Sequence, residues 1–186
     1  MQPDEILVQT AVSAISPGTE MLLYRGQMPS DMALDDTITA LDGVITYPLK
    51  YGYAAVGQVV ENGQGCCDGV ARRFVFAFNP HESHFITKPG DMLPLPDGME
   101  PETAVFLPNM ETAVSFVMDG RPVIGERVAV FGQGVVGLLT TSLLAQFPPG
   151  GIGGGGWVWA AAGMGKQVGE QRPFTTRLNR CPQVLT

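Results

Sequence analysis

The sequence predicts a mixed fold class, with an α+β first half rich in strands followed by the opening of an α/β domain. Two observations lead to this prediction. Short apolar stretches separated by turns that contain Gly and Pro fill most of residues 1–100, which is typical of a small barrel or sandwich. The apolar stretch RVAVF at 127–131 then runs directly into a glycine-rich turn and an apolar helical pattern, as a dinucleotide-binding domain begins.

Four strands are expected in the first half. In the first, EILVQTAVS at 5–13, alternate residues share one face of a strand. In the second, YAAVGQVVE at 53–61, Gly57 indicates a bulge or a close backbone approach. The other two strands are FVFAF at 74–78 and HFITK at 84–88. The SPGT turn after the first strand leads to a short helix through Tyr24, for which Thr19 is the expected cap.

Helical patterns follow from residue 99 onward. Pro101 is favourable in the first turn of one helix, and Asn109 is the expected cap of the next, METAVSFVM, which Gly120 and Pro122 end. After the glycine turn, VVGLLTTSLLAQF places an apolar stripe along one helical face. The stripe consists of Val135, Leu138, Leu139, Leu143 and Phe147.

Composition and charge exclude several classes of protein. The chain of 186 residues is 45% hydrophobic, so it can bury a core, and its formal charge of −7 argues against nucleic acid or an anionic membrane as partner. No apolar run reaches the ~18 residues of a membrane span, and the N-terminus lacks the features of a signal peptide. Three cysteines without a framework fit a reducing cytoplasm, which is the predicted location.

The composition changes near Pro148. Residues 1–147 hold all but one of the 18 acidic residues, whereas residues 148–186 hold 9 of the 24 glycines and both tryptophans. This is a low-complexity signature. We expect residues 148–186 to be poorly ordered, apart from a short strand or helix near 157–162, and an out-of-frame origin for the segment is our hypothesis.

The glycine turn matches the pattern G-x-G-x-x-G. In a dinucleotide-binding turn the first glycine allows the tight bend, the second admits a pyrophosphate and the third lets the helix pack closely, while free N–H groups at the helix start face the anion. The alternative is a purely structural turn. No acidic residue stands about 20 positions on, where the ribose is usually held, and the next one is Glu170. The motif is Gly132-Gln133-Gly134-Val135-Val136-Gly137.

The order of these features resembles the medium-chain dehydrogenase/reductase superfamily, and most closely its zinc-free branch of bacteriochlorophyllide 3-hydroxyethyl dehydrogenase-like proteins. The resemblance rests on the stretches AISPGTEMLLYRG, YPLKYGYAAVGQVVENG, FNPHESHFI, LPNMETAVSF and GERVAVFGQGVVGLL. It implies a GroES-like β-barrel substrate domain, N-terminally incomplete, at residues 1–100. Linker helices and the first strand-turn-helix of a Rossmann domain would follow at 101–147, before the aberrant tail at 148–186.

The resemblance also implies an activity, a zinc-independent transfer of a hydride between an alcohol or ketone and NAD or NADP. Zinc enzymes of the superfamily carry a Cys and a Gly-His-Glu where this chain has Pro17 and Gly52-Tyr53-Ala54, so no metal is expected. The chain itself is expected to bind the cofactor very weakly or not at all, and to be inactive. A small-molecule alcohol or ketone is the expected partner, and the possibility that the chain forms a homo-oligomer is left open.

Three residues are candidate catalytic groups. Tyr53 and Glu20 lie where zinc enzymes of the family hold their metal, so either could relay the alcohol proton instead. Their alternatives are a packed strand residue and a carboxylate in the first turn of a helix. His81 lies in a loop between two strands and could face the substrate cleft. Cys66-Cys67 with His81 and His84 as a metal site is the less favoured alternative to loop cysteines and strand-edge histidines.

The candidate cofactor residues are those of the glycine turn, with Gly132, Gly134, Val135, Val136 and Gly137 at the pyrophosphate. Asn109 and Thr112 resemble the segment that passes beside the nicotinamide, although helix capping is their alternative reading. No Ser-His-Asp triad is visible in the sequence. Two further hypotheses stay open: a non-catalytic GroES-like binding or structural module with a vestigial nucleotide-binding turn, and a chain without a function of its own.

Overall fold

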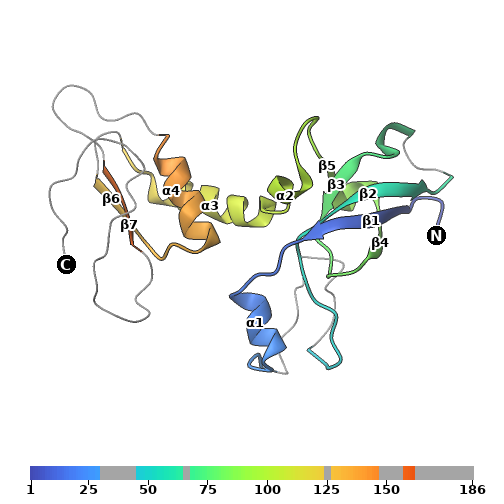
Figure 1. Cartoon of the computed structure of the whole chain (residues 1–186), viewed down its shortest axis with the longest axis horizontal. Coiled ribbons are helices and arrows are strands. Elements are labelled where there is room, and N and C mark those ends of the chain that lie inside the picture. The colour runs from blue at the N-terminus through green and yellow to red at the C-terminus, as the bar shows by residue number, and fades with distance from the viewer. Residues whose placement is uncertain (30–44, 65–67, 124–126, 147–156, 162–186) are drawn as a thin grey trace. The chain divides into compact units, whose positions relative to one another are not determined.

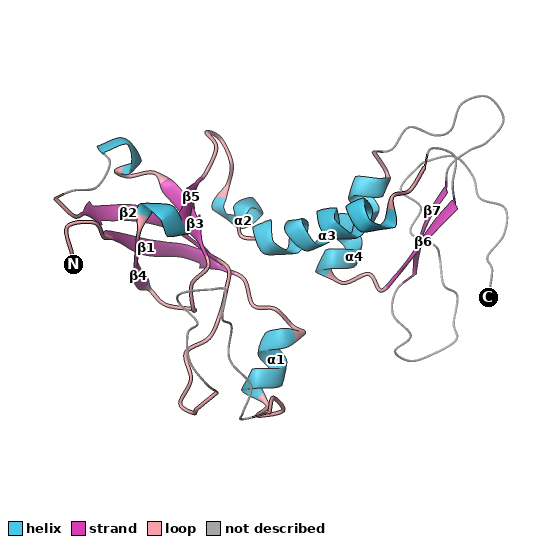
Figure 2. Cartoon of the chain, turned by 180° about the vertical axis from the view of Figure 1, so that it is seen from behind, coloured by secondary structure: helices cyan, strands magenta, loops and turns pink. Residues whose placement is uncertain are grey.

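The structure is a computed structural model, and it describes residues 1–29, 45–64, 68–123, 127–146 and 157–161 (Figure 1). The chain divides into two compact units, Met1–Leu107 and Pro108–Thr186. Strands dominate the first unit, and helices with a pair of strands form the second (Figure 2). The predicted boundaries at 100 and 147 differ from this division and stay predictions. The loop expected over 30–44, the Cys66-Cys67 pair, Phe147 and most of the tail lie outside the described residues.

The first unit is built on a five-stranded antiparallel sheet in the order β4-β1-β2-β3-β5. All four predicted strands are present, so the prediction of a β-rich first half is confirmed. The strand β5 was not predicted. The strands are β1 (Ile6–Ser13), β2 (Ala55–Asn62), β3 (Phe74–Ala77), β4 (His84–Thr87) and β5 (Met92–Pro94).

The pairing of β1 with β2 depends on Gly57. A Cβ atom at Gly57 would lie 2.4 Å from the carbonyl oxygen of Gln9 and 2.6 Å from a Val8 methyl group, so the close backbone approach predicted there is confirmed. The register shifts nearby, between Thr10 and Val12 of β1. Such a bulge bends its strand locally, and this one lies just before the end of β1, where Ser13 stands.

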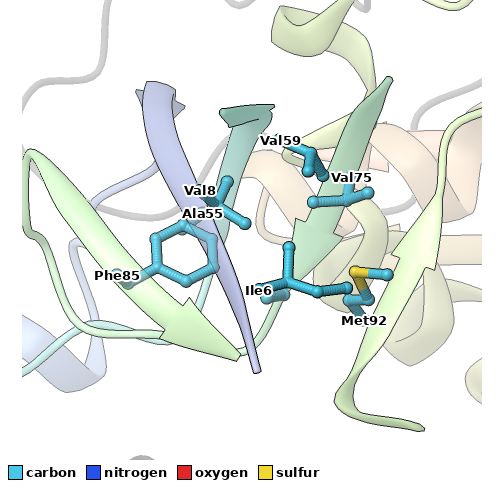
Figure 3. Close-up of a cluster of buried hydrophobic side chains, with 8 residues drawn as sticks. Ile6, Val8, Ala55, Val59, Val75, Phe85 and Met92 are labelled. Atoms are coloured by element: carbon cyan, nitrogen blue, oxygen red, sulfur yellow. The ribbon is translucent and has the colours of Figure 1, made fainter. Parts of the chain in front are cut away.

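Apolar side chains pack on both faces of the sheet. One cluster gathers Ile6 and Val8 of β1 with residues of the other four strands, and Figure 3 shows these side chains together. On the other face a second cluster includes Val56 and Phe76, against which Ala104 and Val105 pack at the end of α2 (Pro101–Ala104). The first cluster consists of Ile6, Val8, Ala55, Val59, Val75, Ala77, Phe85 and Met92.

A short helix, α1 (Thr19–Tyr24), follows β1 after the SPGT turn. The helix was predicted, but the prediction of Thr19 as its cap was wrong, because Gly18 occupies that position without a side-chain hydrogen bond. The Glu20 side chain supports the first turn instead, since its Oε1 accepts a hydrogen bond from the Ser16 N–H at 2.8 Å. Two 3₁₀ turns, Asp68–Val70 and Pro89–Asp91, connect strands later in the unit.

The second unit begins with α3 (Leu107–Gly120), which the structure starts earlier than expected. Asn109 therefore lies inside the first turn, and its prediction as the helix cap was wrong. The reason is Pro108, which is tolerated in a first turn because its missing N–H would have had no partner there. The predicted end at Gly120 is confirmed, and Arg121 follows with a φ of 44°.

A parallel βαβ element completes the second unit. β6 (Arg127–Phe131) leads through the glycine turn into α4 (Val135–Leu144), and β7 (Trp157–Ala161) pairs in parallel with β6 from residue to residue. The helix α4 contacts both strands. A short strand or helix was expected near 157–162, and the structure has a strand there. Of the predicted stripe, Leu138 remains 51% exposed, whereas Thr140, Thr141 and Leu144 of α4 are buried.

Candidate active site

A buried carboxylate and an imidazole meet at the end of the sheet in the first unit. Glu20 lies on α1 and is only 8% exposed, and His81 lies in the loop between β3 and β4. The His81 Nε2 and the Glu20 Oε2 are 2.6 Å apart. The structure therefore brings together two of the three residues that the sequence nominated as catalytic candidates, although they are 61 positions apart.

The other ring nitrogen of His81 faces a serine. His81 Nδ1 lies 3.0 Å from the Oγ of Ser13, the last residue of β1. An ionised carboxylate only accepts hydrogen bonds, so a neutral His81 must carry its proton on Nε2 and donate it to Glu20. Nδ1 is then an acceptor, and the Ser13 hydroxyl donates to it. We call this series of Ser13, His81 and Glu20 the hydroxyl–imidazole–carboxylate cluster.

The position of His81 requires a glycine at residue 52. Gly52 has a φ of 137°, and a Cβ atom there would lie 2.8 Å from the His81 backbone nitrogen and 2.9 Å from two atoms of its ring. The His81 N–H donates to the Tyr51 carbonyl at 3.2 Å, which fixes the loop against the segment before β2. The sequence fits an imidazole here because glycine alone leaves room for it.

The flanking contacts hold the same two loops together. Lys50 and Glu82 form an ion pair at 3.0 Å across them. The Lys50 side chain is largely exposed, so this pair contributes little stability but favours the observed loop approach. Asn79 is buried before His81, and its Nδ2 donates to the Pro80 carbonyl at 3.0 Å.

Tyr53, the third catalytic candidate, packs differently. It is half-buried and contacts the second apolar cluster, whose members include Ala54 and Phe76. This contact agrees with the packing that its alternative reading expects, although Tyr53 lies just before β2 and not in the strand. The hydrogen bonds that the structure gives to the His81 ring go to Ser13 and Glu20, so a role for Tyr53 in proton transfer stays a prediction.

Sequence reasoning missed Ser13. No local signal marks it, because it ends a strand as an ordinary half-buried polar residue. Only the pairing of β1 with β2 and β4, which brings strand ends together with the loop that holds His81, places its hydroxyl beside the ring. The sequence indicated no Ser-His-Asp triad, and a related arrangement of a serine, a histidine and a glutamate arises here through tertiary structure.

The glycine turn of the second unit has the geometry that its sequence predicts. Gly132 has a φ of 85°, which side chains rarely adopt, and a Cβ atom at Gly137 would lie 1.8 Å from the Gly132 carbonyl oxygen. Gly134 precedes α4, and nothing lies within 4 Å of a Cβ built on it. Gly132 thus provides the tight bend, Gly137 the close packing contact and Gly134 the open backbone. Together these features fit a pyrophosphate. Val135 and Val136 begin α4 behind it.

Asn109 and Thr112 lie in the first half of α3. Thr112 Oγ1 donates to the Pro108 carbonyl at 3.0 Å, a local bond within the helix. Asn109 is half-buried in the first turn. Their predicted place beside a nicotinamide stays a prediction.

Within the described ranges, no three His, Cys, Asp or Glu side chains come together in a group that could hold a metal ion. His84 is exposed, with its Nδ1 3.3 Å from the Ser83 Oγ. No helix in the same part of the chain has the length and apolar character needed to cross a membrane.

Solved structures share this arrangement of elements. The structure superposes on CurF ER cyclopropanase from the curacin A biosynthetic pathway with a TM-score of 0.66, at 21% identity over 87% of this chain and 47% of that one. Alcohol dehydrogenase TADH from Thermus sp. ATN1 gives 0.61, at 21% identity over 86% and 51%. This is the fold that the resemblance to medium-chain dehydrogenases and reductases implied, so the predicted fold class is confirmed.

Two further comparisons add detail to this fold assignment. The structure of a putative zinc-binding dehydrogenase from Sinorhizobium meliloti 1021, bound to NADP, gives a TM-score of 0.60 at 21% identity over 79% of this chain and 47% of that one. The 2-desacetyl-2-hydroxyethyl bacteriochlorophyllide A dehydrogenase of Cereibacter sphaeroides is 42% identical over 59 residues, 32% of this chain and 15% of that protein. The chain thus spans about half the length of these structures and less of this relative. No protein-family model matches it.

Proposed function

We propose that this chain is part of a nicotinamide-dependent oxidoreductase, which moves a hydride between an alcohol or ketone and NAD or NADP without zinc. The observation that supports it most is the hydroxyl–imidazole–carboxylate cluster at the end of the first unit's sheet. Alcohol oxidation releases a proton, and a zinc-free site needs a group to accept it. A neutral imidazole held by a carboxylate is such a group.

The proton path follows from the tautomer of His81. Nε2 is occupied by its bond to Glu20, so Nδ1 is the basic atom, and the Ser13 hydroxyl stands at it. A proton from a substrate alcohol reaches Nδ1 through Ser13, and the buried Glu20 carboxylate stabilises the imidazolium that forms. Glu20 retains its other oxygen on the Ser16 N–H and thereby holds the ring in one orientation. Tyr53 is our second candidate, after Ser13, for the hydroxyl group that takes up the proton of the substrate alcohol.

The cofactor would be held at the glycine turn. The open backbone of Gly134 and the N–H groups at the start of α4 suit a pyrophosphate, and NADP bound to the Sinorhizobium meliloti structure supports a nicotinamide cofactor. When bound, this group accepts or donates the hydride. Asn109 and Thr112 are proposed at the nicotinamide end, on the resemblance alone.

Affinity for the cofactor should nevertheless be low. A helix terminus contributes ~0.3–2 kcal/mol to anion binding, whereas micromolar affinity needs about 8 kcal/mol. No acidic residue between Phe147 and Gly169 is available to hold the ribose. We therefore expect no saturable binding of NADH or NADPH below the millimolar range.

Calorimetry with each dinucleotide, extended to several millimolar, tests the proposal. We expect weak binding that Gly134→Val abolishes, because its side chain would fill the space open to the pyrophosphate. Gly120→Val is the matched control, since a Cβ there also meets nothing within 4 Å. A micromolar isotherm would contradict the expected weakness and show that the tail completes the site. No binding at any concentration would contradict the proposal and favour a non-catalytic binding module.

Turnover provides the second arm of the test. The sequence alone predicts an inactive chain, but with the cluster assembled we expect slow oxidation of secondary alcohols at millimolar NAD or NADP. His81→Gln should lower that rate by about 10²-fold or more, as the loss of a general base does. His84→Gln is the control, because His84 is the only other histidine of the chain and has no carboxylate partner in the contacts described here. Equal rates in both variants would remove His81 from the proposed path.

A further inference from the structure

The hydroxyl–imidazole–carboxylate cluster has a second chemical capacity that needs no nicotinamide. A serine hydroxyl bonded to a neutral imidazole, itself bonded to a buried carboxylate, is the arrangement that activates a serine as a nucleophile. The two contacts measure 3.0 Å and 2.6 Å. Both are within the reach that proton transfer from a hydroxyl to a base requires.

We propose that Ser13 is an activated nucleophile that attacks electrophilic carbonyl or phosphoryl centres, with His81 as its base and Glu20 as the group that orients the base. Ser13 is half-buried and the His81 side chain is 28% exposed, so neither residue is closed off from solvent. Glu20, at 8%, stays out of water, where its bond to the ring is strongest. The ligands of such a site are activated esters and similar acyl donors.

A second serine–histidine pair in the chain, Ser83 and His84, provides an internal comparison. Ser83 and His84 also place a serine Oγ near an imidazole Nδ1, at 3.3 Å, but the two residues are adjacent and exposed. The ion pairs of the structure give His81 a carboxylate partner at 2.6 Å and give His84 none among the described residues. If proximity to a histidine were sufficient, both serines would react. If the carboxylate and partial burial matter, only Ser13 would.

A fluorophosphonate is the probe for this proposal. The Ser13 Oγ attacks phosphorus, an Oγ–P bond forms as the P–F bond breaks, and fluoride leaves with the electron pair. The hydroxyl proton moves to His81 Nδ1 and from there to water, so the step requires no oxidant, reductant or cofactor. The product is a stable phosphonylated serine that peptide mass spectrometry locates.

Glu20→Gln is the most informative variant. A glutamine can still accept the Ser16 N–H through its oxygen, but its amide then donates to His81 Nε2. The ring proton must move to Nδ1, which turns the base of Ser13 into a donor and removes the activation. We expect labelling of Ser13 to slow by about 10²-fold or more, as for the loss of a general base. His81→Gln and Ser13→Ala should lose it, and Ser83→Ala should not change it.

The result expected for the wild type is rapid labelling at Ser13 with little at Ser83, in the absence of any dinucleotide. Labelling of Ser13 and Ser83 at equal rates, or of neither, would overturn the proposal. Equal rates in the wild type and Glu20→Gln would do so as well. Imidazole NMR signals, which two histidines make simple to assign, check that each variant keeps its fold. Since no nicotinamide takes part, failure here would weigh against the proton path through Ser13 but would leave dinucleotide binding at the glycine turn, which calorimetry tests separately.

Discussion

Gly52→Ala is the substitution that tests how the candidate active site is built. Two costs add at this position. The backbone φ of 137° is one that side chains rarely adopt, and strain of this kind costs about 1–3 kcal/mol. The new methyl group would also lie 2.8–2.9 Å from backbone and ring atoms of His81, and overpacking costs about 1–3 kcal/mol more. We expect a total destabilisation of about 2–6 kcal/mol.

Gly26→Ala separates the two costs. Gly26 has a φ of 64°, yet nothing lies within 4 Å of a Cβ built on it, so only the backbone cost of about 1–2 kcal/mol applies. Urea unfolding followed by amide NMR signals of β1 and β2 reports on the first unit alone. The free energy of unfolding should fall further in Gly52→Ala than in Gly26→Ala.

A double-mutant cycle with His81→Ala then assigns the difference to the ring. Without the imidazole, two of the three close contacts of the new methyl group disappear, and only the contact with the His81 backbone nitrogen remains. Gly52→Ala should therefore cost less in the His81→Ala background, by a coupling energy of about 0.5–3 kcal/mol. If Gly52→Ala costs no more than Gly26→Ala, or costs the same in both backgrounds, the reasoning about the packing of His81 is refuted.

Three further predictions concern the same unit. Ile6→Ala should lower the free energy of unfolding by about 2–5 kcal/mol because Ile6 is fully buried, whereas Ile86→Ala on the neighbouring strand, 53% exposed, should cost far less in the same urea experiment. The hydrogen bond from Lys88 holds the pKa of the Asp4 carboxyl below its ordinary value, so Lys88→Met should raise that pKa in carboxyl NMR. A lowered pKa stabilises the fold at neutral pH and this contribution fades as pH falls through it, so the stabilities of the two proteins should converge in acid. Purified protein should carry no stoichiometric zinc by elemental analysis, and one tightly held zinc per chain would redirect attention to Cys66, Cys67, His81 and His84.

The strands of the first unit could be predicted because their signal is local. Alternation places Ile6 and Val8 on one face, and the same alternation buries them in the sheet. β5 escaped prediction because it has three residues, ends in Pro94 and exists only through its pairing with β3. The helix caps failed for a related reason. The residue that begins a helix depends on its neighbours, as Pro108 does for α3, and cap-type residues such as Thr19 also occur just inside a helix.

The candidate site shows where local information ends. His81 and Glu20 could be nominated by residue type and position, but nothing local indicates that they touch, since 61 residues separate them. Ser13 could not be nominated at all. In the sequence, Gly52 was considered only as part of a missing metal-ligand motif. Its lack of a side chain is, however, what leaves room for the His81 ring. This steric requirement for glycine can be recognised only once the loop that holds His81 is seen packed against residue 52.

The two oxygens of Glu20 explain why the site's chemistry centres on an imidazole. One accepts the Ser16 N–H that supports the first turn of α1, and the other accepts His81 Nε2. A metal ion drawn to this carboxylate would have to replace hydrogen bonds of a group only 8% exposed, and each lost partner of a buried polar group costs about 1–3 kcal/mol. Because the carboxylate only accepts hydrogen bonds, a neutral His81 places its proton on Nε2 and leaves Nδ1 as the acceptor. A hydrogen-bonded carboxylate thus both disfavours a metal and orients the base on which the proposed proton transfer and the proposed reactivity of Ser13 depend.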